Sequence, residues 1–343
     1  MMGSAASLEE IPNLGTLFNE QRYPAYCLNI VHRLPLFPHF LYSEKYNITL
    51  KEYKTGGNAM TRRIIISTES GADLPEDLRL KYNIQVVPMH VIMDGKDYLD
   101  GTLPVQEIYD FYARNQKIPS TTSTNSHEYH DFFTKINNDF PDCMIVHIGY
   151  TSKASSSFQN AVLASEAFAN LYLIDALNVT GGLTAIVMYA VRLIEQEPTI
   201  APEAILEKIK AIIPKTRLAF IPGSLDFLKA GGRVSNLAYL GGTFLQLKPR
   251  IELVDGILLS SKKYRGKMEK VSEKLMRDYF SEYDMDRNQL YLIYSVGLHE
   301  AIKERASDIA IEYGFNHVKW MQAGAVISTH SGPGGFGIAG IEI

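Results

Sequence analysis

Side chains that could do chemistry gather in three hydroxyl-rich segments of this chain: Thr68–Ser70, Ser120–Thr124 and Thr151–Ser157. Each segment follows an apolar, strand-like run or lies just ahead of a helical pattern. A helix N-terminus leaves about four backbone N–H groups unpaired, and such groups beside hydroxyls bind anions. One segment alone would be an ordinary helix cap. Three at the carboxyl edge of one sheet favour a site for a carboxylate or a phosphate.

Two chargeable side chains lie beside glycine-rich loops. His330 stands in Ser328–Gly334, which we interpret as the end of a strand that enters a glycine loop. Arg233 follows Gly231-Gly232, where a helix is expected to end. Arg265, just before a glycine, reads as a solvated surface residue. Taken alone, each of the three is an ordinary structural or surface group, so none identifies a site by itself.

The segment Gly332–Gly337 matches the dinucleotide-binding pattern GxGxxG. That pattern binds a dinucleotide only when it opens a helix that leads to a second parallel strand. Only Ile338–Ile343 follow it, so such a unit cannot form here. We therefore interpret the glycines as a loop in which the backbone turns sharply or closely approaches another part of the protein.

Hydrolytic and metal chemistry find little support. The nucleophile elbow GxSxG is absent, and Gly149–Lys153 misses its spacing by one residue. Ser260–Lys263 matches SxxK, but it lies at the end of an expected hairpin and not at a helix start. His127 and His130 stand three apart on an expected helix without a third clear ligand. We therefore expect no catalytic residue, metal or cofactor.

The elements that must position these groups begin at Arg63. Apolar strand-like runs there alternate with helical patterns, and this alternation predicts a doubly wound, mostly parallel sheet. Asp73 and Asn125 each precede a glutamate by three residues, which is the pattern of a helix cap. The expected strands are Ile64–Ser67, Ile84–Ile92, Met144–Ile148 and Leu171–Ile174, and two of the expected helices are Val105–Asn115 and Tyr129–Ile136.

The pattern changes after about Pro214 and predicts a second, α+β domain. Asp255-Gly256 is typical of a tight hairpin turn. We expect an N-terminal extension of uncertain structure over residues 1–59, an α/β domain over 60–215 and an α+β domain over 216–343, with the ligand in the cleft between the last two. In the second domain the expected strands are Arg217–Ile221, Arg250–Leu259 as a hairpin, Tyr291–Val296 and Ala323–Ser328, and the expected helices are Leu225–Lys229, Lys267–Glu282 and Glu300–Tyr313.

Composition excludes several classes of protein. The 343 residues are 46% hydrophobic and 21% charged, and a net charge of −4 without a basic stripe argues against a nucleic-acid partner. Cys27 and Cys143 are too few for a disulfide framework, which fits a reducing compartment. The best membrane candidate, Leu183–Ile194, is short and carries Arg192, so no transmembrane segment is expected. With no signal peptide visible, we expect a cytoplasmic protein.

From about Arg63 to Ile343, an ordered series of motifs resembles the DegV family of fatty-acid-binding proteins, which includes the FakB subunits of bacterial fatty acid kinase. Each motif is weak alone, and their order carries the resemblance. The motifs are Ile66–Ser70 with Ala72–Pro75, Val86–Pro88, Tyr98–Gly101, Pro119–Ser123, Thr151–Gln159, Leu173–Ala176, Leu228–Ser235 and His330–Gly334.

The resemblance implies a carrier that buries a long-chain fatty acid between two domains and presents its carboxylate to a separate kinase, which uses ATP and Mg²⁺ and makes an acyl phosphate for phospholipid synthesis. By the same resemblance, Thr121 and Ser155 hold the carboxylate, with Arg233 and His330 near it. Arg265 matches an arginine associated with partner docking. The resemblance also makes Ser70, Thr122 and Ser152 possible ligand-loop residues.

Some positions depart from the family pattern. Glu69 replaces an aspartate, Thr122 and Ala176 replace serines, and Ser156 replaces a glycine that could need a positive φ. In the family pattern these positions bear on the acyl-chain preference and on kinase competence. Two other functions stay open: a stand-alone hydrolase or transferase that uses the same cleft, and a regulatory module in which lipid is only a structural filler.

Overall fold

Three sheets organise the part of the chain that the computed structural model describes, residues 63–236 and 247–343. All of these residues belong to one compact unit. The N-terminal extension expected over residues 1–59 lies outside the described residues.

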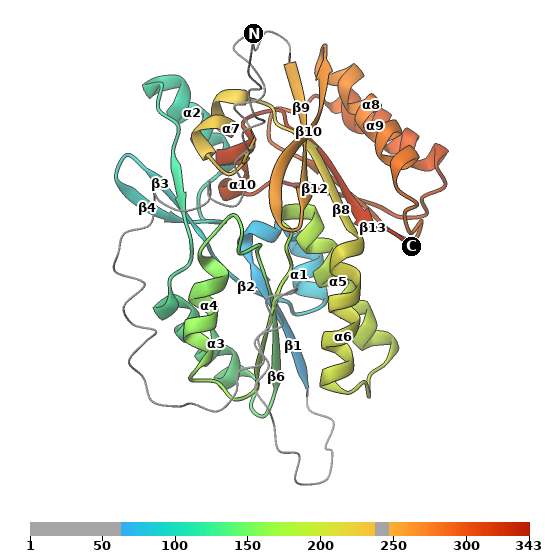
Figure 1. Ribbon diagram of the computed structural model, residues 1–343. Helices are drawn as coiled ribbons and strands as arrows, with labels where there is room; N and C mark the ends of the chain where they lie inside the picture. The colour runs from blue at the N-terminus through green and yellow to red at the C-terminus, as the bar shows by residue number, and fades with distance from the viewer. Residues whose placement is uncertain (1–62, 237–246) are drawn as a thin grey trace, which may run out of the picture. The chain divides into compact units, whose positions relative to one another are not determined.

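The first sheet is the expected parallel one, with strand order β2-β1-β6-β7. Successive side chains of a strand face opposite sides: Ile65 packs against helices α3 and α4, whereas Ile66 packs against α5 and α6. The sheet is therefore the middle layer of three (Figure 1). Its strands are β1 (Ile64–Glu69), β2 (Gln85–Val87), β6 (Met144–Gly149) and β7 (Leu171–Asp175); its helices are α1 (Glu76–Lys81), α3 (Ser126–Asp139), α4 (Ser157–Ser165), α5 (Thr180–Gln196) and α6 (Pro202–Ile212).

A second, three-stranded sheet was not predicted. It is antiparallel and consists of β4 (Lys96–Leu99), β3 (His90–Met93) and β5 (Ser120–Thr122), with α2 (Val105–Asn115) between β4 and β5. The single strand expected over Ile84–Ile92 is wrong, because β2 ends just before Pro88, which lacks an N–H for a ladder. The hydroxyl segment Ser120–Thr124 therefore lies in this sheet and not at the edge of the parallel one, which corrects that expectation.

The third sheet has six strands in the order β10-β9-β8-β13-β11-β12. The hairpin predicted at Asp255-Gly256 is confirmed, and both turn residues have the positive φ that such a turn requires (50° and 81°). Its strands are β8 (Thr216–Ile221), β9 (Leu247–Val254), β10 (Ile257–Arg265), β11 (Leu290–Tyr294), β12 (Val318–Gln322) and β13 (Phe336–Ile341); its helices are α7 (Leu225–Gly231), α8 (Met268–Glu282), α9 (Glu300–Glu312) and α10 (Ala325–Ser331).

Helix α5 lies between the parallel sheet and the six-stranded sheet. Its buried side chains share one hydrophobic cluster with Ile66 of β1 and Ile293 of β11. A Cβ at Gly181 would lie 2.6 Å from the Ile293 side chain, so the helix start approaches β11 closely because it is glycine. The other face of the six-stranded sheet packs on α8 and α9. No helix among the described residues is both long enough and apolar enough to cross a bilayer.

Two local predictions are wrong near the site. The strand expected over Ala323–Ser328 is a helix, α10, so His330 lies in a last helical turn and not at a strand end. Asp73 was expected to cap the next helix, but the residue at that position is Pro75. The Asp73 carboxylate accepts hydrogen bonds from the Thr180 hydroxyl and the Gly324 amide instead. A distant part of the chain thus engages the side chain that local pattern assigned to a cap.

Candidate functional site

An apolar pocket lies where the start of α5, one face of the six-stranded sheet and α10 meet. It contains about 720 Å³ of free space when its part open to solvent is counted. Its walls take residues from both sides of the domain boundary expected at 215/216. The lining residues are Tyr150, Val179 and Thr180; Leu218, Phe220 and Ile221; Leu228, Arg233, Val234 and Leu258; Ile293, Tyr294 and Ser295; and Ala323, Ile327, His330, Ser331, Gly335, Phe336 and Gly337.

His330 is a polar group in this apolar wall. Its Nε2 lies 2.8 Å from the Thr121 hydroxyl oxygen on β5, across 209 residues of sequence. Its Nδ1 is buried without a hydrogen-bond partner. Burial, with a smaller contribution from the charge of Arg233, lowers the pKa of His330 to about 4. The ring is therefore neutral near pH 7 and has one nitrogen without a partner.

Arg233 lines the same pocket as His330, and its charge acts on the ring of His330. Helix α7 ends at Gly232, which has a φ of 65°, and the chain then turns so that Arg233 Nη1 donates to the Gly231 carbonyl at 2.6 Å. A Cβ at Gly231 would lie 2.3 Å from His330 Nδ1, so only glycine permits this approach. Fold and glycines thus bring a cation to the partnerless imidazole.

Thr121 and Ser155 are not wall residues of the pocket. Thr121 contacts His330, which is a wall residue of the pocket, but does not itself line the pocket. Ser155 accepts a hydrogen bond at 3.1 Å from the amide of Ser157, the first residue of α4. Their loops are joined by a contact of 2.9 Å between the hydroxyls of Ser123 and Ser156. Two of the four predicted carboxylate ligands, Arg233 and His330, therefore line the pocket, and the other two, Thr121 on β5 and Ser155 before α4, do not.

Ser156 does not need the glycine that the family pattern led us to consider. Its φ is −79°, an ordinary value for any residue. Its hydroxyl instead supplies the link to Ser123. The departure therefore adds a contact between two loops without straining the backbone.

The other predicted loop residues do not line the pocket. The Ser70 hydroxyl accepts from the Met89 amide at 3.0 Å. The Ser152 amide donates to the Asp175 carboxylate at 3.3 Å, at the end of β7. Thr122 is exposed and, by the alternation of a strand, faces away from the side of β5 that carries Thr121.

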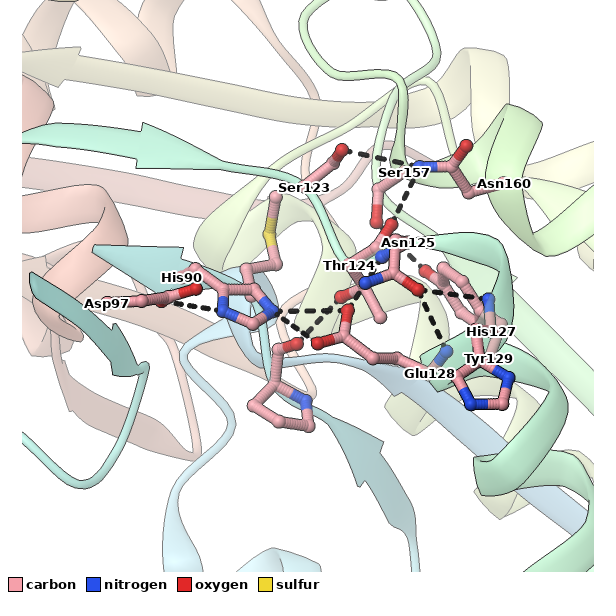
Figure 2. A network of polar contacts seen from close by, with 12 residues as sticks. His90, Asp97, Ser123, Thr124, Asn125, His127, Glu128, Tyr129, Ser157 and Asn160 are labelled. Atoms are coloured by element: carbon pink, nitrogen blue, oxygen red, sulfur yellow. Dashed lines mark hydrogen bonds and ion pairs between the residues drawn. The ribbon is translucent and has the colours of Figure 1, made fainter. Parts of the chain in front are cut away.

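A polar network near Thr122 was missed by sequence reasoning, apart from one cap. Figure 2 shows His90 between two carboxylates: its Nδ1 lies 2.8 Å from Asp97 and its Nε2 lies 3.1 Å from Glu128. The capping box predicted for Asn125 and Glu128 is confirmed. Nearby, the Tyr129 hydroxyl donates to the buried Glu69 carboxylate at 2.5 Å. Glutamate at position 69 thus has a partner in α3.

Arg265 lies in a different, basic groove. Its free space is about 840 Å³ when the part open to solvent is counted. The groove combines four cationic side chains with a tyrosine and two aliphatic residues. Its lining residues are Leu247, Lys263, Tyr264, Arg265, Lys270, Val271 and Lys274.

The glycine loop after α10 leads directly into β13, which confirms that it is no dinucleotide fingerprint. Gly332 and Gly334 have φ values of 69° and 75°. A Cβ at Gly223 would lie 1.8 Å from the Pro333 carbonyl oxygen, so two backbone segments touch there. The Gly223 amide also donates to the Ser331 carbonyl at 2.8 Å, and these contacts fix the chain next to His330.

Residues of the pocket that sequence reasoning missed include Tyr150 and Thr180. Tyr150 directly follows β6 and precedes a predicted hydroxyl segment, so its place beyond the carboxyl end of a parallel strand was a usable signal. Burial raises its pKa, which keeps its hydroxyl neutral. Thr180 starts α5 with a φ of 40°, rare for a β-branched residue, and no sequence signal reveals it. Within the described residues no group of three or more His, Cys, Asp or Glu side chains is arranged to hold a metal ion.

The comparisons with known proteins agree with this architecture. The family model described as an uncharacterised protein of the DegV family matches residues 63–342. A DegV domain-containing protein of Caldanaerobacter subterraneus is 31% identical over 280 residues, which are 80% of this chain and 98% of that protein. A fatty acid-binding protein of Thermotoga maritima is 29% identical over 82% of this chain and 99% of its own.

Among solved structures, the chain resembles a stearic acid-binding protein from Eubacterium ventriosum. The two are 25% identical, the TM-score is 0.70, and the match covers 81% of this chain and 97% of that one. The fold of the parallel sheet and of the following sheet and helices is therefore shared with a protein that binds stearic acid. On the family match over nearly all described residues, this chain belongs to the DegV family.

Proposed function

We propose that this protein is a fatty-acid carrier that buries an acyl chain in the apolar pocket and holds its carboxylate near His330. One observation carries the proposal: the wall of the pocket is almost wholly apolar and includes a cation and a partnerless imidazole on which its charge acts. The stearic acid-binding relative supports it, because its fold is shared along most of both chains.

The acyl chain of the fatty acid supplies most of the binding affinity. Burial of one methylene contributes about 0.8 kcal/mol, so about fourteen methylenes contribute on the order of 11 kcal/mol before the cost of association. Side chains such as Leu218, Phe220 and Ile293 offer the apolar surface that this transfer requires.

The carboxylate supplies orientation. A buried carboxylate needs donors to replace its water. The hydroxyl of Thr121, the guanidinium of Arg233 and a protonated nitrogen of His330 provide such donors, with Ser155 on the loop linked to that of Thr121. A bound carboxylate beside His330 also favours the protonated ring, so its arrival gives the partnerless nitrogen a charged acceptor.

The double variant Thr121→Ala with Ser155→Ala tests the carboxylate site. Delipidated protein reloaded with labelled palmitate should retain roughly a hundredfold less of it, since each of the two lost hydrogen bonds to a charged group weakens binding by about 1.5 kcal/mol. Thr102→Ala with Ser281→Ala removes two exposed hydroxyls elsewhere and serves as the matched control. Retention equal to that of the control would remove these residues from the site.

The second part of the proposal is presentation to an ATP-dependent kinase that phosphorylates the bound carboxylate. Phosphoryl transfer depends chiefly on positioning and charge neutralisation, which Arg233 and His330 could provide. The basic groove around Arg265 offers a docking surface for an acidic partner. We expect His330→Ala and Arg233→Ala to keep bound lipid but form acyl phosphate more slowly beside a cognate kinase. Full turnover by both variants would end their proposed role.

The same assay separates the alternatives. Product formation from a fatty acid or hydroxy acid without any added protein would favour a stand-alone enzyme. Lipid that neither exchanges with labelled palmitate nor becomes phosphorylated would favour a structural filler in a regulatory module.

A further inference from the structure

Helix α10 contributes one face to the pocket and the other to the core. Ile327, His330 and Ser331 lie three or four residues apart and line the pocket. Ala325 and Val326 pack instead in a cluster with residues of β3, α2 and α7. The position of the helix therefore sets where the His330 ring lies relative to Thr121.

The N-terminus of α10 is held by two carboxylates from distant parts of the chain. Asp73 accepts from the Gly324 amide at 2.7 Å. Asp100, at the end of the β3–β4 hairpin, accepts from the Ala325 amide at 2.9 Å and from the Val326 amide at 3.4 Å. These amides belong to the first turn, whose N–H groups have no partner within the helix.

Gly324 permits both carboxylates to approach. A Cβ there would lie 3.1 Å from an oxygen of Asp73 and 3.2 Å from an oxygen of Asp100. Asp73 also accepts from the hydroxyl of Thr180, a wall residue of the pocket, at 2.5 Å. The pair thus ties the helix that carries His330 to η1 (Ser70–Ala72) beyond β1, to the β3–β4 hairpin and to the start of α5.

The two carboxylates oppose one another electrostatically. Burial raises the pKa of both, and the charge of Asp100 raises that of Asp73 further. The second oxygen of Asp100 is buried without a hydrogen-bond partner. Each acid nonetheless accepts from different amides at the start of α10, so both take part in holding this end of the helix.

We propose that Asp73 and Asp100 are positioning residues for His330: they hold the N-terminal end of α10 so that the ring at its other end meets Thr121. The consequence for acyl-phosphate formation rests on the proposed function, whereas the consequence for the ring itself does not.

The main test compares three variants in ligand-free, full-length protein, with the His330 ring followed by NMR during a pH titration. Asp100→Ala removes the acceptor of two α10 amides and should move the titration of the ring upward by about one unit, toward that of an exposed histidine. Asp100→Asn keeps an acceptor and adds a donor beside Asp73, so it should leave the ring near its original value. Asp97→Ala, in the same hairpin but bonded to His90, is the matched control and should have no effect.

Gly324→Ala provides a second variant should Asp100→Ala fail to fold. Gly324 has a φ of −68°, which alanine adopts freely, so the substitution acts only by pressing on the two carboxylates. We expect the same upward shift of the ring, smaller than in Asp100→Ala.

Acyl-phosphate formation beside a cognate kinase is the second readout. We expect about a tenfold loss for Asp100→Ala, with recovery in Asp100→Asn. An unmoved ring in folded Asp100→Ala and Gly324→Ala would overturn the proposal, even if lipid retention fell, because that outcome describes a merely structural cap. If the unmodified protein neither binds nor presents palmitate, the proposed function fails, and the titration still decides whether the two acids position the ring.

Discussion

Two histidines of this protein, His90 and His330, have contrasting polar surroundings. His90 has a carboxylate at each ring nitrogen, Asp97 on one side and Glu128 on the other (Figure 2). His330 has a hydroxyl at one nitrogen and nothing at the other, and the nearby charge is the cation Arg233. The protein thus supplies a partner for both ring nitrogens of His90, whereas His330 Nδ1 has none, and under the proposed function the carboxylate of the ligand binds there.

The contrast teaches how to separate a structural polar cluster from a binding site in this fold. Buried polar groups are normally satisfied, so the network around His90 stabilises the junction of β3, β4 and α3. The partnerless nitrogen beside an apolar pocket is a cost that the folded protein alone does not recover. Substitutions should therefore affect stability in one region and ligand chemistry or pH response in the other.

The largest expected effect is a pH-dependent loss of stability that belongs to His330. Because the folded pKa of about 4 lies below the ordinary value of 6.5, the unfolded chain binds more protons between these limits. The neutral ring thus contributes stability that is full above pH 6.5 and falls by at most about 3 kcal/mol toward pH 4. Urea unfolding of His330→Gln should lack this loss.

The raised pKa values of Asp73, Asp100 and Asp175 act with the opposite sign, because folding favours their protonated forms at low pH. The three aspartates are present in both the unmodified protein and His330→Gln. The difference between the stability–pH curves of these two proteins therefore isolates the contribution of the histidine. His127→Gln, an exposed histidine, is the control. If the unmodified protein and His330→Gln lost stability equally between pH 6.5 and pH 4, the loss would not belong to His330.

Next in size is Tyr129→Phe, which should destabilise the protein by about 2 kcal/mol. The change leaves the buried Glu69 carboxylate without the hydroxyl that donates to it. Chemical denaturation measures the loss, with Tyr112→Phe as the control, and retention of labelled palmitate by the folded protein should stay unchanged. Weaker retention at equal stability would place Tyr129 in the ligand site instead.

A smaller loss, about 1.5 kcal/mol, is expected for His90→Ala. The loss is moderate because Asp97 and Glu128 are 57% and 35% exposed and can take up water when the ring is removed. Thermal unfolding checks the stability, and palmitate retention should not change. An altered acyl-phosphate rate in this variant would show that the two histidine regions are coupled.

The smallest effect concerns the cap in the His90 network. Asn125→Ala should cost about 1 kcal/mol, because the amides of His127 and Glu128 lose their acceptor, and Asn125→Gly should cost only a few tenths. Denaturation midpoints of the two variants give the comparison. Equal losses in the two variants would contradict a capping role for the Asn125 side chain.

Much of the fold follows from local pattern. The helix predicted over Val105–Asn115 has those bounds in the structure, and the turn at Asp255-Gly256 forms as predicted. The β3–β4 hairpin of the three-stranded sheet was missed although it turns at Asp94-Gly95, which is the same kind of signal as Asp255-Gly256. The pairing of β3 with β5 could not be predicted, because these short strands pair across α2. The strand expected at Ala323–Ser328 fails for a similar reason: a short apolar run suits a strand or a helix, and here Asp73 and Asp100 supply the acceptors that a helix start needs.

The candidate site, like the fold, was predicted only in part. Arg233 and His330 were identified by resemblance and lie together at the pocket, whereas Ser70, Thr122 and Ser152 belong to the same motifs and do not line it. Motif membership places a residue in a loop, but the direction of its side chain depends on strand register and on contacts far along the chain.

The amino-acid sequence by itself determined most of the alternation of strands and helices, the cap at Asn125, the turn at Asp255-Gly256 and the family, because these depend on residues close together in the chain. Only the tertiary structure decided that α10 is a helix, that His330 meets Thr121 across the molecule, and that one ring nitrogen stays without a partner. Those features depend on burial and on hydrogen bonds between distant residues, which set the free energy of each polar group but leave no local pattern.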